Sequence, residues 1–308
     1  MRFSVSIFFC LVLLVSCKTS QKVVVPEVKE PQLSNDDGFR MPEMYVGFYN
    51  VENLFDTVDD PKVRDEDWLP TSKKKWTKER YEKKIDMIAE VIEAMDAPII
   101  MGLCEVENAM VLKDLVECKR LKKYGYDFAH FDSPDKRGID NALLYQPAKF
   151  AFSNKKKIQI DFPKEIVADY TTRDVLMVSG RSFGQNMTFI VNHWPSRRGG
   201  VKASEPKRVY VAKQVRHAVD SLLKINPNVI VMGDFNDEPN NKSVSEVLNA
   251  TGKNGNGVLI NLFYETQAAG EGSYNYRGNW NMLDQIMVGA DLTTNKWSIF
   301  ASQPEIIK

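Results

Sequence analysis

The chain has 308 residues, of which 43% are hydrophobic and 10% aromatic, so it can bury a sizeable core in one large domain or two small ones. Basic and acidic residues number 41 each, which gives a formal net charge of zero. A neutral chain produces no global electrostatic field, and this excludes nonspecific, charge-driven binding to nucleic acid or membranes. Local charged patches remain compatible with that balance.

Residues 1–17 are typical of an export signal. Arg2 precedes the uncharged stretch FSVSIFFCLVLLVSC, which is too short to span a bilayer comfortably but suits a signal-peptide core. The sequence LVSC resembles a bacterial lipoprotein processing box, in which Cys17 is lipidated and becomes the new N-terminus. An ordinary signal sequence with an incidental cysteine is the alternative. The sequence therefore predicts an exported protein, anchored by lipid to the periplasmic face of a membrane or to the cell surface.

The next segment, residues 18–42, predicts a flexible tether, because PEVKEPQLSNDDG is rich in proline and charge. Residues 43–308 predict one α/β domain, since apolar runs alternate with helical patterns. Helices are predicted where apolar residues recur at spacings of three and four, over residues 81–95, 111–118 and 212–222. Strands are predicted at IIMGLC, DNALLYQP, KKIQIDF, DVLMVSG and MTFIVNH. Gly184 separates the last two and indicates an antiparallel hairpin, so mixed strand directions are expected.

Two cysteines remain after removal of the leader. Cys104 ends an apolar strand and Cys118 fits the inner face of a predicted helix. Because neither has metal-ligand spacing, we expect both to be buried and unpaired.

Several predicted strands run directly into polar side chains. The stretch VIVMGDFNDEP leads from four apolar residues and a glycine into Asp234, Asn236 and further acids, and carboxylates are rarely buried without a partner. The stretches YVGFYNVEN, IIMGLCEVEN, MTFIVNHWPSR and NMLDQIMVG behave alike and deliver Asn50, Glu105, His193 and Asp284. Neighbouring strands that end at one edge of a sheet bring such groups together. We therefore expect one polar site at that edge.

The chemistry of this set favours a hard cation. Carboxylate and amide oxygens suit Mg²⁺, Mn²⁺ or Ca²⁺, whereas zinc prefers histidine and cysteine, and the chain has three histidines. A divalent cation beside a histidine suits hydrolysis of a phosphate ester by in-line attack of water. Each residue alone has a structural alternative: Glu105 as a helix cap, Asn50 in a turn, His193 as a hydrogen-bonded strand end, and Asp237 as a turn residue.

The ordered set FYNVENLFD, GLCEVEN, NHWPSR, GDFND and LDQI resembles the endonuclease/exonuclease/phosphatase superfamily over about residues 44–290. The resemblance implies a four-layer αββα sandwich of two packed mixed sheets, with helices on the outer faces and a divalent cation. It places Asn50 and Glu105 at the metal, with Glu105 as the direct ligand. It implies that Asp234 and Asn236 orient the attacking water and the scissile phosphate. It implies that His193 contacts the phosphate or assists the leaving group. Asp284 matches the aspartate that orients a second histidine, and Asp140 falls at the edge of the site.

That second histidine is absent from the sequence. The superfamily ends with a Ser-Asp-His segment on a last strand, and no histidine follows His217 here. The sequence stops before this element, either because it is incomplete or because the protein is shortened. The first interpretation is favoured because Trp297, Ile299 and Phe300 resemble the start of further structure. The resemblance implies an impaired chain, since losing a general base costs about 10²–10⁴-fold in rate.

The resemblance implies a phosphate-ester substrate and leaves DNA, RNA, phosphoinositides and sphingomyelin open. Arg197 and Arg198 follow His193 and are candidate ligands for substrate phosphate, including a nucleic-acid backbone. One hypothesis is a monomeric, metal-dependent phosphodiesterase or phosphomonoesterase, endonuclease-like and displayed by lipid. The other is a catalytically impaired lipoprotein that binds phosphate or a partner on the same scaffold.

Overall fold

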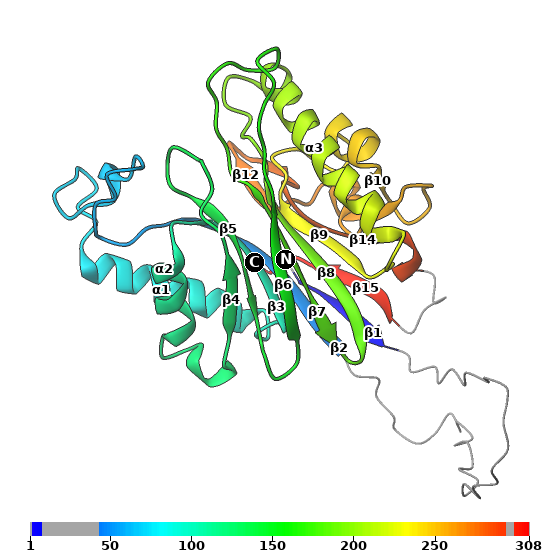
Figure 1. The fold of residues 1–308 in the computed structure, drawn as a ribbon, viewed down its shortest axis with the longest axis horizontal. Coiled ribbons are helices and arrows are strands. Elements are labelled where there is room, and N and C mark those ends of the chain that lie inside the picture. Colours follow the sequence, from blue (N-terminus) through cyan, green and yellow to red (C-terminus); the bar gives the residue numbers. More distant parts are fainter. Residues whose placement is uncertain (1, 8–42, 294–298, 308) are drawn as a thin grey trace, which may run out of the picture.

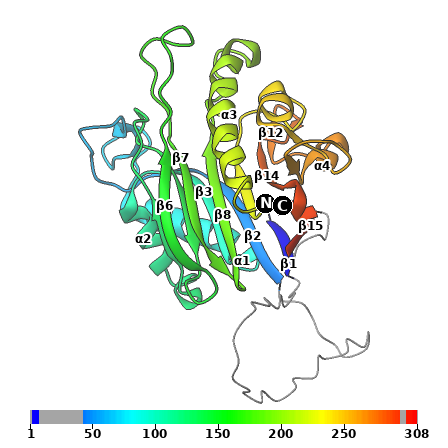
Figure 2. The same ribbon diagram turned by 45° about the vertical axis from the view of Figure 1, so that its right-hand side comes forward.

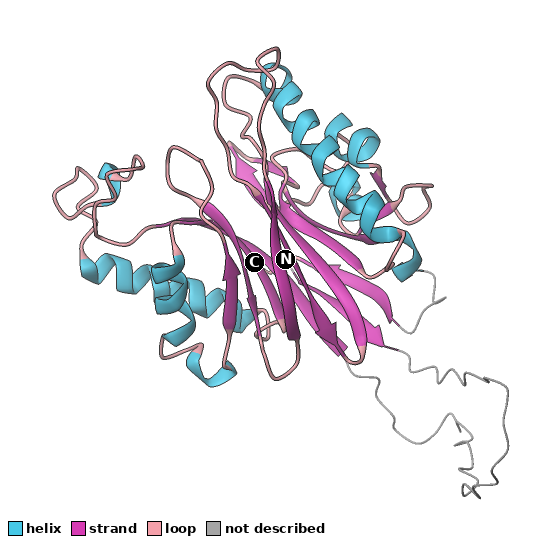
Figure 3. Ribbon diagram, in the orientation of Figure 1, coloured by secondary structure: helices cyan, strands magenta, loops and turns pink. Residues whose placement is uncertain are grey.

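A computed structural model describes residues 2–7, 43–293 and 299–307. Within these ranges two mixed sheets pack face to face (Figures 1 and 3). The first has the order β15-β1-β2-β3-β5-β4 and the second β10-β11-β14-β9-β8-β7-β6. The first sheet contains β1 (Arg2–Ile7), β2 (Glu43–Leu54), β3 (Ile100–Val106), β4 (Asp127–His130), β5 (Asp140–Tyr145) and β15 (Ile299–Glu305). The second contains β6 (Ala151–Ile158), β7 (Val175–Ser182), β8 (Gln185–His193), β9 (Val229–Asp234), β10 (Ala250–Thr251), β11 (Leu259–Asn261) and β14 (Asp284–Gly289).

Helices cover the outer face of each sheet (Figures 1 and 2). The first sheet carries α1 (Lys78–Ala94) and α2 (Ala109–Glu117), and the second carries α3 (Val201–Leu223). Shorter elements are η1 (Glu66–Trp68), η2 (Lys122–Tyr124), η3 (Ser243–Leu248), α4 (Tyr264–Ala268) and η4 (Ala290–Thr293), together with a separate hairpin of β12 (Tyr274–Tyr276) and β13 (Asn279–Asn281). The predicted αββα sandwich of two mixed sheets is confirmed.

Strand alternation explains why the layers pack in this way. In β9, Ile230 and Met232 point between the sheets, whereas Val229 and Val231 point toward α3. Successive strand side chains face opposite sides, so a strand that is apolar throughout is buried on both faces. The sandwich therefore has three apolar layers, one between the sheets and one beneath the helices of each side.

The helices α1 and α2 and the β7–β8 hairpin lie close to the predicted ranges, whereas α3 begins at Val201, eleven residues before the predicted start at residue 212. The turn at Phe183 and Gly184 joins β7 to β8 as an antiparallel pair, as expected. The strand predicted at KKIQIDF instead begins at Ala151, because the exposed lysines of β6 form a solvated sheet edge without an apolar pattern. Cys104 is buried and free, but Cys118 is partly exposed because it caps the end of α2.

The described N-terminal residues belong to the sheet. Strand β1 pairs antiparallel with both β2 and β15 (Figure 2). These residues lie within the segment that the sequence predicts to be a signal peptide, so cleavage before Cys17 would remove β1. Cys17, residues 8–42 and Trp297 lie outside the described residues. Ile299 and Phe300 do begin a strand, as their apolar character indicated.

No helix in the described part of the chain has the length and apolar character needed to cross a membrane.

Candidate active site

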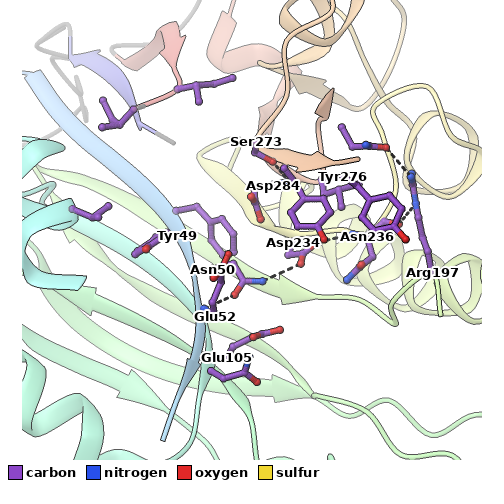
Figure 4. Close-up of a pocket in the computed structure, with 18 of the residues that line it drawn as sticks. Tyr49, Asn50, Glu52, Glu105, Arg197, Asp234, Asn236, Ser273, Tyr276 and Asp284 are labelled. Carbon is purple, nitrogen blue, oxygen red and sulfur yellow. Dashed lines mark hydrogen bonds between the residues drawn. The ribbon is translucent and has the colours of Figure 1, made fainter. Parts of the chain in front are cut away.

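A cavity of about 1080 Å³ opens where the two sheets end together (Figure 4). Strand β2 contributes Asn50, the end of β3 contributes Glu105, and β9 contributes Asp234. Asn236 follows β9, and Asp284 begins β14. The structure thus brings together five of the six residues from the predicted strand ends as lining residues of one cavity.

Strand register sets the relative positions of the acids. Asp234 is paired with His193 across the parallel β8–β9 ladder and with Asp284 across the antiparallel β9–β14 ladder. Three chemically active side chains therefore stand at one level on three adjacent strands. Gly233 permits the approach of β8 and β9, because a Cβ there would overlap the Asn192 carbonyl oxygen.

Glu105 is aimed into the cavity by a backbone irregularity. The residue has φ of 65°, in the left-handed region that non-glycine residues rarely adopt. The pairing of β3 with β5 shifts register between Cys104 and Val106, so Glu105 is the extra residue of a bulge. Asn236 has φ of 49° after β9. Such strain persists where the surrounding structure enforces it, and it often accompanies function.

Asn50 links the two sheets across the cavity floor. Its Nδ2 donates to Asp234 Oδ2 at 3.1 Å, and its Oδ1 accepts from the Glu52 amide at 2.9 Å (Figure 4). Asn50 therefore closes a turn, as the structural alternative had it, and also reaches the site. The other oxygen of Asp234, Oδ1, accepts from the Asn236 amide at 2.8 Å. These bonds hold the Asp234 carboxylate in a fixed orientation.

The buried carboxylates of the cavity resist ionisation. Burial raises the pKa of Glu105, Arg137 partly offsets this, and Asp234 raises it further. Burial also raises the pKa of Asp234 despite its hydrogen bonds. Burial and the neighbouring Asp234 raise the pKa of Asp284 to about 7. A group of acids that resists ionisation has a high affinity for a positive charge placed among them.

His193 lies beneath the cavity and is 5% exposed. Its Nε2 is 3.8 Å from Glu105 Oε1 and 3.7 Å from Asp234 Oδ2. Burial lowers the pKa of His193, and Arg173 and Arg137 lower it further. The imidazole is therefore neutral at pH 7, and its Nε2 faces the gap between the two carboxylates.

The two arginines after β8 play different structural parts. Arg198 is exposed and lines the cavity. Arg197 also borders it, but its guanidinium is occupied: Nε donates to the Asn236 carbonyl at 2.8 Å, and its two terminal nitrogens donate to Asn241 Oδ1 at 2.9 Å and Asn281 Oδ1 at 3.2 Å. Arg197 thus joins the loop after β9 to the β12–β13 hairpin.

Asp140 sits at the edge of the first sheet without lining the cavity. Its Oδ2 lies 3.1 Å from His130 Nε2, and its Oδ1 accepts from the Ser133 amide and hydroxyl. Burial raises its pKa, and His130 and Ser133 partly offset the effect. His130, Asp132 and Asp140 are grouped closely enough to ligate a cation, but the Asp140 carboxyl is already satisfied by its neighbours.

Sequence reasoning missed the buried support of the loop after β9. Asp237, predicted as a turn residue, is 1% exposed and pairs with Arg208 Nε at 2.6 Å. It also accepts from the Ser243 hydroxyl at 2.6 Å. Arg208 comes from α3 and is fully buried. Arg208 precedes the helix predicted over residues 212–222, so no predicted element placed it in the core. Asn108, not Glu105, caps α2, by accepting from the amides of Met110 and Val111.

The donor set fits a hard divalent cation. Glu105, Asp234 and Asp284 supply carboxylate oxygens, and Asn50 supplies an amide oxygen. Burial raises the pKa of Glu105 and of Asp234, and a cation bound among these carboxylates would favour their ionised forms. Oxygen-only donors favour Mg²⁺, Mn²⁺ or Ca²⁺ over zinc.

The described residues thus form four layers with an acidic, amide-bearing cavity at the edge of the paired sheets. A family model described as "Endonuclease/Exonuclease/phosphatase family" matches residues 45–306, and the chain belongs to that family. No curated protein matches the chain.

Solved structures share this fold at low identity. A Bacteroides thetaiotaomicron endonuclease/exonuclease/phosphatase family protein is 20% identical with a TM-score of 0.51, covering 79% of this chain and 81% of its own. The human Nocturnin catalytic domain with bound sulfate is 20% identical with a TM-score of 0.50, covering 68% and 74%. The Bacteroides thetaiotaomicron mannosyl-6-phosphatase Bt3783 is 18% identical with a TM-score of 0.50, covering 79% and 84%.

Proposed function

We propose that this protein is a divalent-metal-dependent hydrolase of phosphodiester or phosphomonoester bonds that uses water as the direct nucleophile. The observation that carries this proposal is the convergence of Asn50, Glu105, Asp234, Asn236 and Asp284 on one cavity, with His193 directly beneath. Family membership supports it. The sulfate bound to the Nocturnin catalytic domain and the phosphatase activity in the name of Bt3783 are consistent with this reaction class.

The residues have distinct roles in the proposed reaction. Glu105 and Asn50 would hold the cation, which would neutralise phosphate charge when bound. Asp234 is fixed by Asn50 and by the Asn236 amide, so its carboxylate orients the attacking water. Neutral His193 presents Nε2 between Glu105 and Asp234, where it donates to a phosphate oxygen or assists the leaving group. Asp284, with its raised pKa, is a proton-holding group beside Asp234.

A second candidate is a phosphate-binding protein with little turnover. Three histidines occur in the sequence, and all three are described: His130 pairs with Asp140, His217 lies on α3, and His193 is part of the site. The described site therefore holds one histidine, where the resemblance implies two. Loss of a general base reduces a rate by about 10²–10⁴-fold and leaves cation and phosphate binding intact.

The test is hydrolysis by the purified chain of bis(p-nitrophenyl) phosphate, a diester, and p-nitrophenyl phosphate, a monoester, with Mg²⁺ or with EDTA. The proposal expects Mg²⁺-dependent turnover that Glu105→Gln abolishes, while Cys118→Ser, far from the cavity on α2, keeps wild-type activity. Mg²⁺ and phosphate binding without turnover of either ester would establish the second candidate. Neither binding nor turnover would overturn both.

We also propose that the protein is exported and attached to a membrane through lipid on Cys17, which the leader and the processing box support. Mass spectrometry of the mature protein should show a lipid-modified N-terminus at Cys17. Cys17→Ser should release the protein from the membrane fraction. A mature chain that still begins at Met1 would contradict this proposal.

A further inference from the structure

The β12–β13 hairpin places two exposed aromatic rings on the wall of the cavity. Tyr274 and Tyr276 are 46% and 52% exposed, their ring centroids are 6.5 Å apart, and their planes differ by 13°. Both line the cavity, and Figure 4 shows Tyr276 on the side occupied by Asp234 and Asp284. Parallel exposed rings in a concave site provide a flat apolar surface for a ligand ring.

Strand pairing separates the two faces of this hairpin. Tyr274 pairs with Asn281 and Tyr276 with Asn279, whereas Trp280 pairs with Asn275. Side chains of adjacent strand positions face opposite sides, so Trp280 points away from the tyrosines. Trp280 is equally exposed, at 53%, but does not line the cavity. The face of the hairpin that carries Tyr274 and Tyr276 is therefore the face turned toward the cavity.

The hairpin is held in register with the acids. Ser273 Oγ accepts from the Asp284 amide at 3.0 Å, and the Ser273 amide donates to the Asn281 carbonyl at 2.9 Å. Arg197 binds Asn281 Oδ1 at 3.2 Å and the Asn236 carbonyl at 2.8 Å. Hydrogen bonds thus connect the hairpin that carries Tyr274 and Tyr276 to the acidic end of the cavity.

The charge of the cavity limits the number of phosphates that it accepts. Its described lining contains five carboxylate side chains (Glu52, Glu90, Glu105, Asp234 and Asp284) and two guanidinium groups (Arg197 and Arg198). The guanidinium of Arg197 is committed to protein acceptors. One phosphate is balanced by a cation at Glu105, but further phosphates would meet acids. A nucleic-acid strand requires a continuous basic track, and the described lining does not form one.

Hydroxyl groups suit this lining better than additional phosphates. Carboxylates accept hydrogen bonds from hydroxyls, and an amide such as that of Asn53 can both donate and accept. The volume of about 1080 Å³ is ample for a small ring-bearing molecule. An uncharged ring with several hydroxyls, attached to one phosphate, satisfies the aromatic wall, the acids and the cation together.

We propose that Tyr274 and Tyr276 form a stacking subsite for the hydroxyl-bearing ring of a small phosphate ester, so that the substrate is of the sugar phosphate class rather than a nucleic-acid strand. This inference rests on the proposed hydrolase function and specifies its substrate class.

The test compares the wild-type chain, the double variant Tyr274→Ala/Tyr276→Ala and the matched control Trp280→Ala, each with Mg²⁺. The probes are a hexose 6-phosphate, ring-free glycerol 3-phosphate and a short single-stranded DNA. The double variant should raise KM for the hexose phosphate about 5–10-fold, as expected for loss of aromatic contacts, with little change for glycerol 3-phosphate. Trp280→Ala should have the wild-type KM for the hexose phosphate and for glycerol 3-phosphate.

The inference fails if single-stranded DNA is the better substrate, or if the double variant behaves like Trp280→Ala on the hexose phosphate. If no probe and no p-nitrophenyl ester is hydrolysed, the hydrolase function fails, and calorimetric binding of the hexose phosphate decides the subsite separately. Binding that weakens in the tyrosine variant alone supports the subsite. Equal binding by all three proteins, or binding by none of them, overturns it.

Discussion

Arg197 offers the sharpest contrast between a residue that binds substrate and one that positions the site. Its guanidinium makes three hydrogen bonds of 2.8, 2.9 and 3.2 Å, to the Asn236 carbonyl and to the side chains of Asn241 and Asn281. The side chain is 22% exposed. Hydrogen bonds to a charged group contribute about 1.5–3 kcal/mol each when buried, and water replaces part of them at this exposure. We expect Arg197→Ala to lower the free energy of unfolding by about 2–4 kcal/mol.

The same change should lower kcat more than it raises KM, because Asn236 and the hairpin lose their common support. Arg198→Ala is the matched control. Because Arg198 is exposed and lines the cavity, this substitution should change the free energy of unfolding by less than about 0.5 kcal/mol and raise KM. Arg197→Lys should recover little, because an ammonium cannot reproduce the planar fork that reaches three acceptors. Urea unfolding and steady-state kinetics measure both effects. The reasoning is refuted if Arg197→Ala is as stable as the wild type and changes only KM, since Arg197 would then be a phosphate ligand.

Two further changes test the strain and the charge of the site. Glu105→Gly should be more stable than Glu105→Ala by about 1 kcal/mol in thermal unfolding, because the φ of 65° at this position is unfavourable for a residue with a Cβ. Both variants should lose Mg²⁺ binding. Equal stability of the two variants would show that the bulge relaxes. Without metal, stability should fall as pH rises from about 4 to about 7. Asp284 has a pKa of 3.8 when unperturbed and about 7 in the fold, so within this range the folded state holds a proton that the unfolded state has lost. Asp284→Asn should reduce this pH dependence when melting temperatures are measured across the range. A pH dependence equal to that of the wild type would show that other acids cause it.

Motifs at strand ends predicted the site because adjacent strands of a sheet bring residues that are far apart in sequence close together in space. His193 and Asp234 end apolar strands and Asp284 begins one, and their ladders place them at one level regardless of the sequence between them. Asn50 and Glu105 reach the same edge from the opposite sheet. A pattern of this kind depends only on strand ends, which an apolar run reveals.

Other parts of the site depend on packing that no local pattern expresses. Asp237 is a turn residue by its position before Pro239, and its buried pairing with Arg208 exists only because α3 packs over the loop. The spacing after His193 does not distinguish Arg197 from Arg198, yet one is held by three acceptors and the other is exposed.

Tyr274 and Tyr276 belong to a strand too short to show alternation in the sequence. Asp140 was assigned to the edge of the site by the family resemblance, whereas its carboxyl is bound by His130 and Ser133. The orientation of a side chain at a shared edge is decided by such partners.

The measurement that tests the central claim most directly is the Mg²⁺-dependent kcat/KM of the wild-type chain and of Asp234→Asn on bis(p-nitrophenyl) phosphate. The carboxylate that Asn50 and the Asn236 amide hold in place should be essential, so we expect the substitution to reduce kcat/KM by about 10²–10⁴-fold while the fold is retained. Asp234→Asn hydrolysing this ester at the wild-type rate, or wild-type turnover that persists in EDTA, would contradict a metal-dependent site at this cavity.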